Sequence, residues 1–379
     1  MEATMDCAQA DCGSASSMTF QSVLLKWVRI YFNLFVLLGT AGPLYIAWFI
    51  WRMVSLPLPA HIYQRGDDFI FEYYQRLALI LAETFAGLEI HFYGDFKDIM
   101  DKRENFLLMS NHQTASDWIM NNSVAERFNC VGHMRYFMKD FIKLFPLYGF
   151  YFYHHGCIYV NRKNCDFEKM RRNLVYLQNK RISTIVTIFP EGTRYRPELL
   201  EESHKFADKN FLRRLNHVLY PRTRGLGATI DYMRHNVEAL YDLTVIYDNT
   251  KVDGKRVGAP SLIALFTGDC PVVHVHLERI PIADIPKEEA EIKDFILNQF
   301  LKKEELLSKY YDDPTNTQPF PGGALQKPLN HTRQMIVLAI SVIALCYFCF
   351  TWSGISIIMK VWIMGTLFGY GWLLLNHFV

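Results

Sequence analysis

A histidine and an aspartate five positions apart, His112 and Asp117, are the residues of this sequence best suited to chemistry. An imidazole can act as a general base, and a nearby carboxylate can orient it. On one continuous helix, five residues turn through roughly 500°, which would place the two side chains about 140° apart. We therefore expect the chain to turn between them, with Thr114 and Ser116 as candidate helix caps.

The segments on either side predict a strand followed by a helix. Phe106–Met109 is a short apolar run, typical of a buried strand, and 118–128 has the pattern of an amphipathic helix. The stretch Asn111-His112-Gln113-Thr114-Ala115-Ser116-Asp117-Trp118 would then lie at the strand-to-helix turn. Taken alone, this spacing is also common by chance.

A second turn, Glu191-Gly192-Thr193-Arg194, follows the apolar run 184–189 and Pro190. It would expose backbone N–H groups, a hydroxyl and a guanidinium beyond a strand end, where α/β proteins bind ligands. Such groups suit a phosphate, which arginine can hold with two parallel hydrogen bonds. The alternative is an ordinary tight turn whose Arg194 pairs with a surface carboxylate.

Two more arginine-bearing segments could bind anions. The predicted strand 157–160 leads to Arg162, and Pro221-Arg222-Thr223-Arg224-Gly225 precedes a predicted helix N-terminus, itself a favourable anion site. Lys139 lies upstream of the first. Each could be a solvated basic loop, but together with the 191–194 turn they predict a substrate with several phosphates, or two phosphorylated substrates.

Strand and helix patterns alternate from about residue 89 to residue 307. This rhythm predicts a single α/β domain built on one mixed, largely parallel sheet. The expected strands are 89–93, 106–110, 135–138, 157–160, 184–189, 243–247 and 272–277, and the expected helices are 166–180, 204–215, 227–240 and 287–307.

Long uncharged segments occupy both ends of the chain. Ile30–Trp51 would form a helix of roughly 33 Å, enough to cross a hydrocarbon core of about 30 Å. Met335–Met359 and Val361–Val379 predict either two further spans or one span and an interfacial helix. We therefore expect an integral membrane protein, divided into a disordered N-terminus (1–19), a membrane anchor (20–56), the α/β domain (57–311), a linker (312–333) and C-terminal membrane segments (334–379).

Composition argues against nucleic-acid binding and against zinc sites or disulfides. The formal net charge of +2 is too small for a typical nucleic-acid-binding protein. The eight cysteines include no Cys-x2-Cys pair in the soluble part, which favours free thiols in a reducing compartment over a zinc site or disulfides.

Taken in order, four segments resemble the conserved blocks of the glycerolipid acyltransferases. The likeness is greatest to the 1-acyl-glycerol-3-phosphate (lysophosphatidic acid) acyltransferases, in the longer animal subgroup with the gamma, delta and epsilon forms and lysocardiolipin acyltransferase. It covers the chain from about Leu38, and Ile142, where leucine is common, is a small departure. The matching segments are Asn111-His112-x4-Asp117-Trp118, Gly156-x-Ile158-x-Val160-x-Arg162, Phe189-Pro190-Glu191-Gly192-Thr193-Arg194 and Pro221-Arg222-Thr223-Arg224-Gly225, with Tyr241-Asp242-Leu243-Thr244-Val245 and the double apolar C-terminus as subgroup marks.

The resemblance implies a role for each candidate residue. His112 would take the proton from a lysophospholipid hydroxyl as that oxygen attacks an acyl-CoA thioester, and Asp117 would hold the imidazole, without an acyl-enzyme. No metal or cofactor is implied, and acyl-CoA is a co-substrate. Arg162, Glu191, Gly192, Thr193 and Arg194 would position the glycerol phosphate, while Arg222, Arg224 and Lys139 are candidates for the phosphates of the acceptor or of CoA.

The resemblance also implies the partners, which are acyl-CoA, lysophosphatidic acid or a related lysophospholipid, and the lipid bilayer. The expected location is the endoplasmic reticulum membrane, with a mitochondrial membrane as the alternative. A lysocardiolipin or other lysophospholipid acyltransferase, an acyl-CoA hydrolase and a non-catalytic lipid-binding membrane protein are the competing interpretations.

Overall fold

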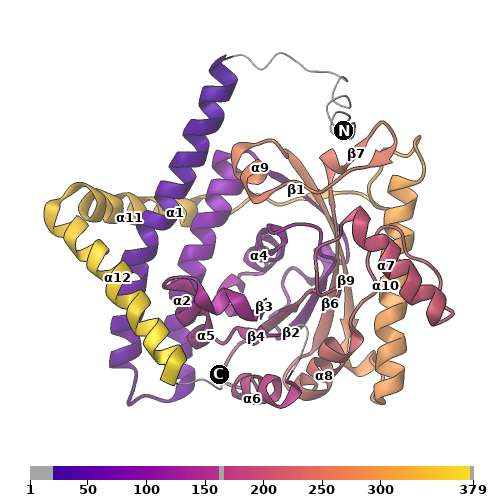
Figure 1. Ribbon diagram of the computed structural model, residues 1–379, viewed down its shortest axis with the longest axis horizontal. Coiled ribbons are helices and arrows are strands. Elements are labelled where there is room, and N and C mark those ends of the chain that lie inside the picture. Colours follow the sequence, from indigo (N-terminus) through magenta and orange to yellow (C-terminus); the bar gives the residue numbers. More distant parts are fainter. Residues whose placement is uncertain (1–19, 162–165, 376–379) are drawn as a thin grey trace, which may run out of the picture.

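An eight-stranded sheet forms the centre of the computed structural model, which describes residues 20–161 and 166–375 (Figure 1). Its strands lie in the order β10-β1-β9-β6-β2-β5-β3-β4. The pairs β6–β9 and β1–β10 are antiparallel and the others parallel, so the predicted mixed, largely parallel α/β fold is confirmed. The strands are β1 (Glu89–Gly94), β2 (Phe106–Ser110), β3 (Met134–Lys139), β4 (Ile158–Val160), β5 (Ile185–Ile188), β6 (Ala239–Tyr247), β9 (Val272–Pro281) and β10 (Leu325–Gln326), with a separate hairpin of β7 (Lys251–Val252) and β8 (Lys255–Arg256).

Both faces of the sheet are covered, which explains why its central strands are apolar runs. Along β2, Phe106 and Leu108 pack into the core on one face, and Leu107 and Met109 pack into the core on the other. The first face carries α2 (Ala60–Leu79), which continues into a π-helix (Ile80–Phe85), α3 (Phe96–Ile99), α4 (Asp117–Arg127), α5 (Tyr148–His155) and α9 (Leu262–Thr267); the second carries α6 (Phe167–Leu177), α8 (Thr223–Met233) and α10 (Glu289–Tyr311), and α7 (Pro197–Lys209) flanks it.

Two helix predictions were wrong in their bounds. The helix expected over 204–215 is α7, which begins at Pro197 and ends at Lys209, because proline suits the first turn of a helix. The helix expected over 227–240 is α8, which begins at Thr223 and ends at Met233, and the chain enters β6 at Ala239.

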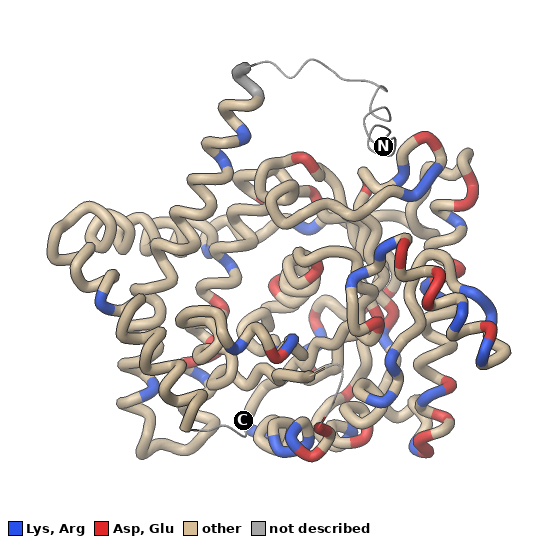
Figure 2. The backbone as a smooth tube through the Cα atoms, viewed as in Figure 1, with Lys and Arg blue, Asp and Glu red and all other residues tan. Residues whose placement is uncertain are grey.

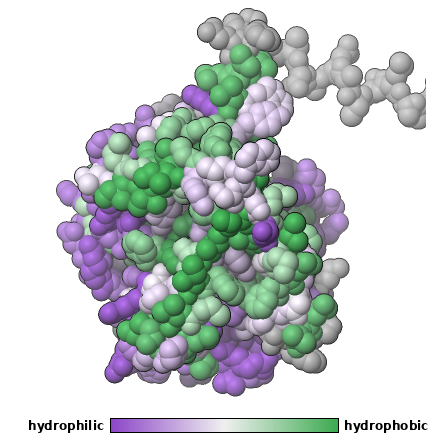
Figure 3. Space-filling model, turned by 90° about the vertical axis from the view of Figure 1, so that its left-hand side faces the viewer, coloured by the Kyte–Doolittle hydropathy of each residue, from purple (hydrophilic) through white to green (hydrophobic). Residues whose placement is uncertain are grey.

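Within the described part of the chain, three helices are long and apolar enough to cross a membrane: α1 (Phe20–Val54), α11 (His331–Phe350) and α12 (Trp352–Leu375). Few charged residues lie on them, whereas Lys, Arg, Asp and Glu are spread over the rest of the molecule (Figure 2). On the face of the molecule where these three helices lie, apolar side chains form a diagonal band (Figure 3). At the bend between α11 and α12, Phe350 is 73% and Trp352 90% exposed, as expected for a surface that meets lipid.

These helices also pack against the α/β domain. Asn33 of α1 donates to the Phe266 carbonyl at 2.9 Å, and Trp48 is buried. On α11, the Val337 carbonyl and the Ser341 hydroxyl lie 3.1 and 2.7 Å from the Tyr73 hydroxyl of α2. Between the domain and α11, the segment expected to be a linker contributes β10 to the sheet edge beside β1. The expected N-terminal disorder (1–19) lies outside the described residues.

Candidate functional site

His112 and Asp117 meet across the turn between β2 and α4. His112 Nδ1 lies 2.8 Å from Asp117 Oδ2, and the same oxygen accepts the backbone N–H groups of Gln113 at 2.6 Å and Thr114 at 3.0 Å. The aspartate therefore closes the turn that brings the two residues together. Its side chain is 1% exposed and that of His112 is 15% exposed, so the imidazole is open to solvent and the carboxylate is not.

Thr114 and Ser116 were the expected helix caps, but neither side chain caps α4 in the structure. Ser116 precedes the first residue of α4, but its side chain makes no capping hydrogen bond. The Thr114 hydroxyl donates instead to the Pro260 carbonyl at 2.6 Å. The Asp117 carboxylate instead accepts the N–H groups of Gln113 and Thr114, which precede α4, through Oδ2, and the Tyr247 hydroxyl at 2.7 Å through Oδ1.

Asn111 and Gln113 attach the turn to β6, a role that sequence analysis missed. The Asn111 amide donates to the Val245 carbonyl at 3.2 Å and accepts the Val245 N–H at 2.8 Å, so it replaces a backbone pair beyond the end of β2. The Gln113 side chain donates to the same carbonyl at 2.6 Å and accepts from Arg256 at 2.8 Å. Asn111 falls in the matched motif, but its partner lies 134 positions away and could not be inferred from spacing.

Glu191 uses both carboxylate oxygens to accept backbone N–H groups. One oxygen accepts the His112 N–H at 2.7 Å and the other the Leu219 N–H at 2.9 Å. Burial raises the pKa of Glu191 to about 8, against the lowering effect of those two N–H groups. Glu191 therefore connects the histidine turn to the chain before α8.

Gly192 lets the turn after β5 approach Arg222. Its φ of +70° is a left-handed conformation that favours glycine, and a Cβ atom there would lie 3.0 Å from Arg222 Cδ and 3.1 Å from Nε. The Arg222 N–H also donates to the Pro190 carbonyl at 2.7 Å. The 191–194 turn and the segment 221–225 are therefore in contact, although they are separate in the sequence.

A cleft of about 810 Å³ opens beside these turns and is lined by both polar and apolar side chains. The turns contribute Gly192, Thr193, Arg222 and Arg224, and both arginines are exposed. Apolar lining comes from the ends of β3 and β4 and from α6 and α7: Phe137, Met138, Val160, Phe167 and Phe206, while Glu202 and Ser203 of α7 are polar. His112 is connected to the cleft through Phe189, which lines it and stacks on the imidazole with ring centroids 4.4 Å apart.

The remaining predicted residues lie around the cleft or outside the description. Arg194 is half-buried beside Tyr195, whose N–H donates to the His112 carbonyl at 2.7 Å, so its backbone is close to the histidine turn. Lys139 is exposed at the end of β3. Among the described residues, neither Lys139 nor Arg194 lines the cleft. Arg162 lies outside the described residues.

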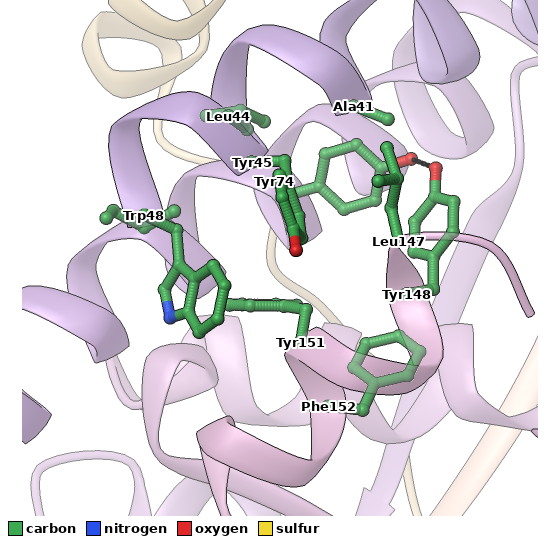
Figure 4. Close-up of a pocket in the computed structure, with 10 residues that line it drawn as sticks. Ala41, Leu44, Tyr45, Trp48, Tyr74, Leu147, Tyr148, Tyr151 and Phe152 are labelled. Atoms are coloured by element: carbon green, nitrogen blue, oxygen red, sulfur yellow. Dashed lines mark hydrogen bonds between the residues drawn. The ribbon is translucent and has the colours of Figure 1, made fainter. Parts of the chain in front are cut away.

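A smaller apolar cavity of about 40 Å³ lies between α1, α2 and α5 (Figure 4). The Tyr45 hydroxyl points into it, and the Tyr74 and Tyr148 hydroxyls are bonded to each other at 2.6 Å on its wall. Its volume suffices only for a few water-sized groups. As it stands, it cannot hold a long acyl chain.

One group of described residues has its potential ligand atoms as close together as a metal site requires. Atoms of Asp67, Asp68 and His155 lie within 4.8 Å of one another. The Arg135 guanidinium already occupies this group, because it donates to Asp68 and lies 2.8 Å from His155 Nε2. The group is therefore a buried ion network between α2, β3 and α5.

Two family models match the chain, one described as Acyltransferase over residues 91–230 and one as Acyltransferase C-terminus over 264–342. The 1-acyl-sn-glycerol-3-phosphate acyltransferase epsilon of Mus musculus is 36% identical over 90% of this chain and 94% of its own length. Lysocardiolipin acyltransferase 1 of Mus musculus is 25% identical over 86% of this chain and 85% of its own. The solved structure of the 1-acyl-sn-glycerophosphate (LPA) acyltransferase PlsC from Thermotoga maritima aligns with 76% of this chain and 96% of its own, at 15% identity and a TM-score of 0.46.

Proposed function

This chain belongs to the 1-acyl-sn-glycerol-3-phosphate acyltransferase family, and we propose that it moves a fatty acyl group from acyl-CoA to the free hydroxyl of lysophosphatidic acid. The product would be phosphatidic acid, a phospholipid precursor. The observation that carries this proposal is the 2.8 Å contact between His112 Nδ1 and Asp117 Oδ2, next to a cleft lined by cationic and apolar side chains.

In the proposed reaction, His112 acts through Nε2, because Nδ1 is held by Asp117. Nε2 takes the proton from the acceptor hydroxyl as its oxygen attacks the thioester carbonyl carbon. A new C–O bond forms, the C–S bond breaks, and the proton passes from the imidazolium to the CoA thiolate. Asp117 keeps the imidazole in the required tautomer and stabilises the imidazolium. No acyl-enzyme, metal or cofactor takes part in this scheme.

The cationic and the apolar residues of the cleft match the two ends of an amphiphile. Arg222, Arg224, the Thr193 hydroxyl and the Gly192 N–H would hold phosphate groups, and the aromatic and aliphatic wall would hold an acyl chain. Arg162, Arg194 and Lys139 remain further candidates for the phosphates. Glu191 supports the site through the backbone of His112.

The three apolar helices suit this chemistry, because both substrates partition to a bilayer surface. A domain packed against those helices would meet its substrates without extracting them into water. We propose a multi-pass protein of the endoplasmic reticulum membrane, with a mitochondrial membrane as the alternative.

A lysocardiolipin or other lysophospholipid acceptor is the second candidate, favoured by the similarity to lysocardiolipin acyltransferase 1. A hydrolase would use the same base on water. A non-catalytic lipid-binding protein would need neither His112 nor Asp117, although both are present and in contact.

The test is a product assay on the full-length protein in lipid nanodiscs, with labelled acyl-CoA and separate acceptors: lysophosphatidic acid, lysocardiolipin and lysophosphatidylcholine. We expect labelled phosphatidic acid as the main product. Preferred labelling of cardiolipin would support the second candidate, and free fatty acid in the presence of every acceptor would identify a hydrolase. No product from any acceptor would refute an acyltransferase.

A further inference from the structure

Tyr247, the last residue of β6, approaches the catalytic pair from the far side of Asp117. Its hydroxyl lies 2.7 Å from Asp117 Oδ1, and its side chain is fully buried. We propose that Tyr247 is a positioning residue, which fixes the orientation and the charge distribution of the Asp117 carboxylate for the reaction of His112. This inference rests on the proposed function and adds a residue that acts through another.

The direction of the Tyr247–Asp117 hydrogen bond is determined by chemistry. An ionised carboxylate has only acceptors, so the tyrosine must donate. Burial and the adjacent Asp117 raise the pKa of Tyr247 well above its usual value of 10, and Cys270 is a further titratable neighbour. The hydroxyl therefore keeps its proton throughout the pH range in which the enzyme would work.

The position of the tyrosine is fixed by the sheet. Tyr247 pairs with Val273 in the antiparallel ladder between β6 and β9, and its carbonyl accepts the Thr250 hydroxyl at 2.5 Å. Its ring packs into the core that also contains Ile119 and Met120 of α4. A donor held this firmly selects one rotamer of Asp117, with Oδ1 toward Tyr247 and Oδ2 toward His112.

Besides fixing the rotamer of Asp117, the hydrogen bond from Tyr247 affects which residue holds the proton during the reaction. During the reaction, His112 must hold the proton taken from the acceptor hydroxyl and then deliver it to the CoA thiolate. The Tyr247 hydroxyl donates to Oδ1 and the two backbone N–H groups donate to Oδ2, so lone pairs of both carboxylate oxygens are already used. The proton therefore remains on the imidazolium and does not pass to Asp117.

The experiment compares Tyr247→Phe with Tyr241→Phe in the full-length protein. Tyr241 is a matched control, because it is also a buried tyrosine of β6, and its hydroxyl donates to a different carboxylate, Glu104, at 2.6 Å. A hydrogen bond to a charged group is strong enough for a loss of about 10-fold in kcat. We expect that loss in Tyr247→Phe, with KM for both substrates within about twofold, and a kcat within about twofold of wild type in Tyr241→Phe.

Two further readouts separate positioning from packing. In an Asp117→Ala background, Tyr247→Phe should change kcat less than about twofold, because the hydrogen bond is already lost. Without the donor, the carboxylate stabilises the imidazolium more, so the acid limb of the pH profile of kcat/KM should move to higher pH in Tyr247→Phe. 3-Fluorotyrosine at position 247, a stronger donor of nearly the same shape, should move it to lower pH.

Each other result has a defined meaning. A Tyr247→Phe activity equal to wild type, or an equal loss in the Asp117→Ala background, would overturn the inference. If Tyr247→Phe does not fold, the fluorotyrosine protein decides: an unmoved acid limb overturns the inference and a limb moved to lower pH supports it. A wild-type protein without acyl transfer would instead refute the proposed function itself.

Discussion

At the scale of single residues, the Asp117 carboxylate collects four donors, and three of them come from its own turn. Gln113, Thr114 and His112 are within five positions of it, whereas Tyr247 is 130 positions away. The residue types and their spacing, together with the three other matched segments, predicted the His112–Asp117 pair. Tyr247 and Asn111 could not be predicted in the same way, because their roles depend on the neighbouring strand that the fold supplies.

Glu191 predicts a pH-dependent stability. Burial raises its pKa from 4.5 to about 8, so the folded protein retains a proton that the unfolded chain has released. The stabilising contribution is full below about pH 4.5 and is lost as the pH rises through about 8. We expect the thermal midpoint of the wild type to fall relative to that of Glu191→Gln across this range, measured by circular dichroism in detergent.

Glu198→Gln is the matched control, because Glu198 lies exposed in the first turn of α7. Its midpoint should run parallel to that of the wild type at every pH. Parallel curves for wild type and Glu191→Gln would contradict the burial of a protonated Glu191.

At the scale of elements, apolar runs located seven strands of the sheet, since a strand covered on both faces is apolar along its length, but they did not reveal the short edge strand β10. The bounds of α7 and α8 were less predictable. α7 ends at Lys209 because Phe211 adopts a left-handed conformation, with a φ of +56°, and the Leu212 N–H donates back to the Ala207 carbonyl at 2.9 Å. A residue other than glycine in this conformation is not apparent from the local sequence.

The turn after β5 gives the prediction at this scale. Gly192→Ala should cost about 1–2 kcal/mol for the left-handed conformation and should displace the Arg222 side chain. Because Arg222 lines the cleft, we expect the KM for the phosphate-bearing acceptor to rise about 10-fold, whereas kcat should change less.

Gly227→Ala is its control, since Gly227 lies in α8 away from the cleft lining, and a Cβ there would meet only Ile292 Cγ2, at an ordinary contact distance of 3.4 Å. It should keep the wild-type KM. Steady-state kinetics with lysophosphatidic acid as the varied substrate measures both variants, and an unchanged KM in Gly192→Ala would show that the turn does not position the phosphate.

At the scale of the whole molecule, the three long apolar helices come from both ends of the chain and pack on the same domain. Long uncharged segments made them predictable. Their docking was not predictable, because it depends on single contacts such as the Tyr73 hydroxyl with Val337 and Ser341.

Deletion of residues 331–379 tests this arrangement. We expect the truncated protein to stay in the membrane pellet after an alkaline carbonate wash, since α1 alone is long enough to span. Its thermal midpoint should fall further than that of Tyr73→Phe, which removes only the hydroxyl contact with α11. Release of the truncated protein into the supernatant would show that α1 does not anchor it.

The measurement that tests the central claim most directly is the rate of phosphatidic acid formation from acyl-CoA and lysophosphatidic acid by wild type and His112→Ala in matched nanodiscs. Removal of a general base costs about 10²–10⁴-fold in rate, and we expect a loss in that range with the thermal midpoint preserved. A folded His112→Ala protein with the wild-type rate would contradict the account.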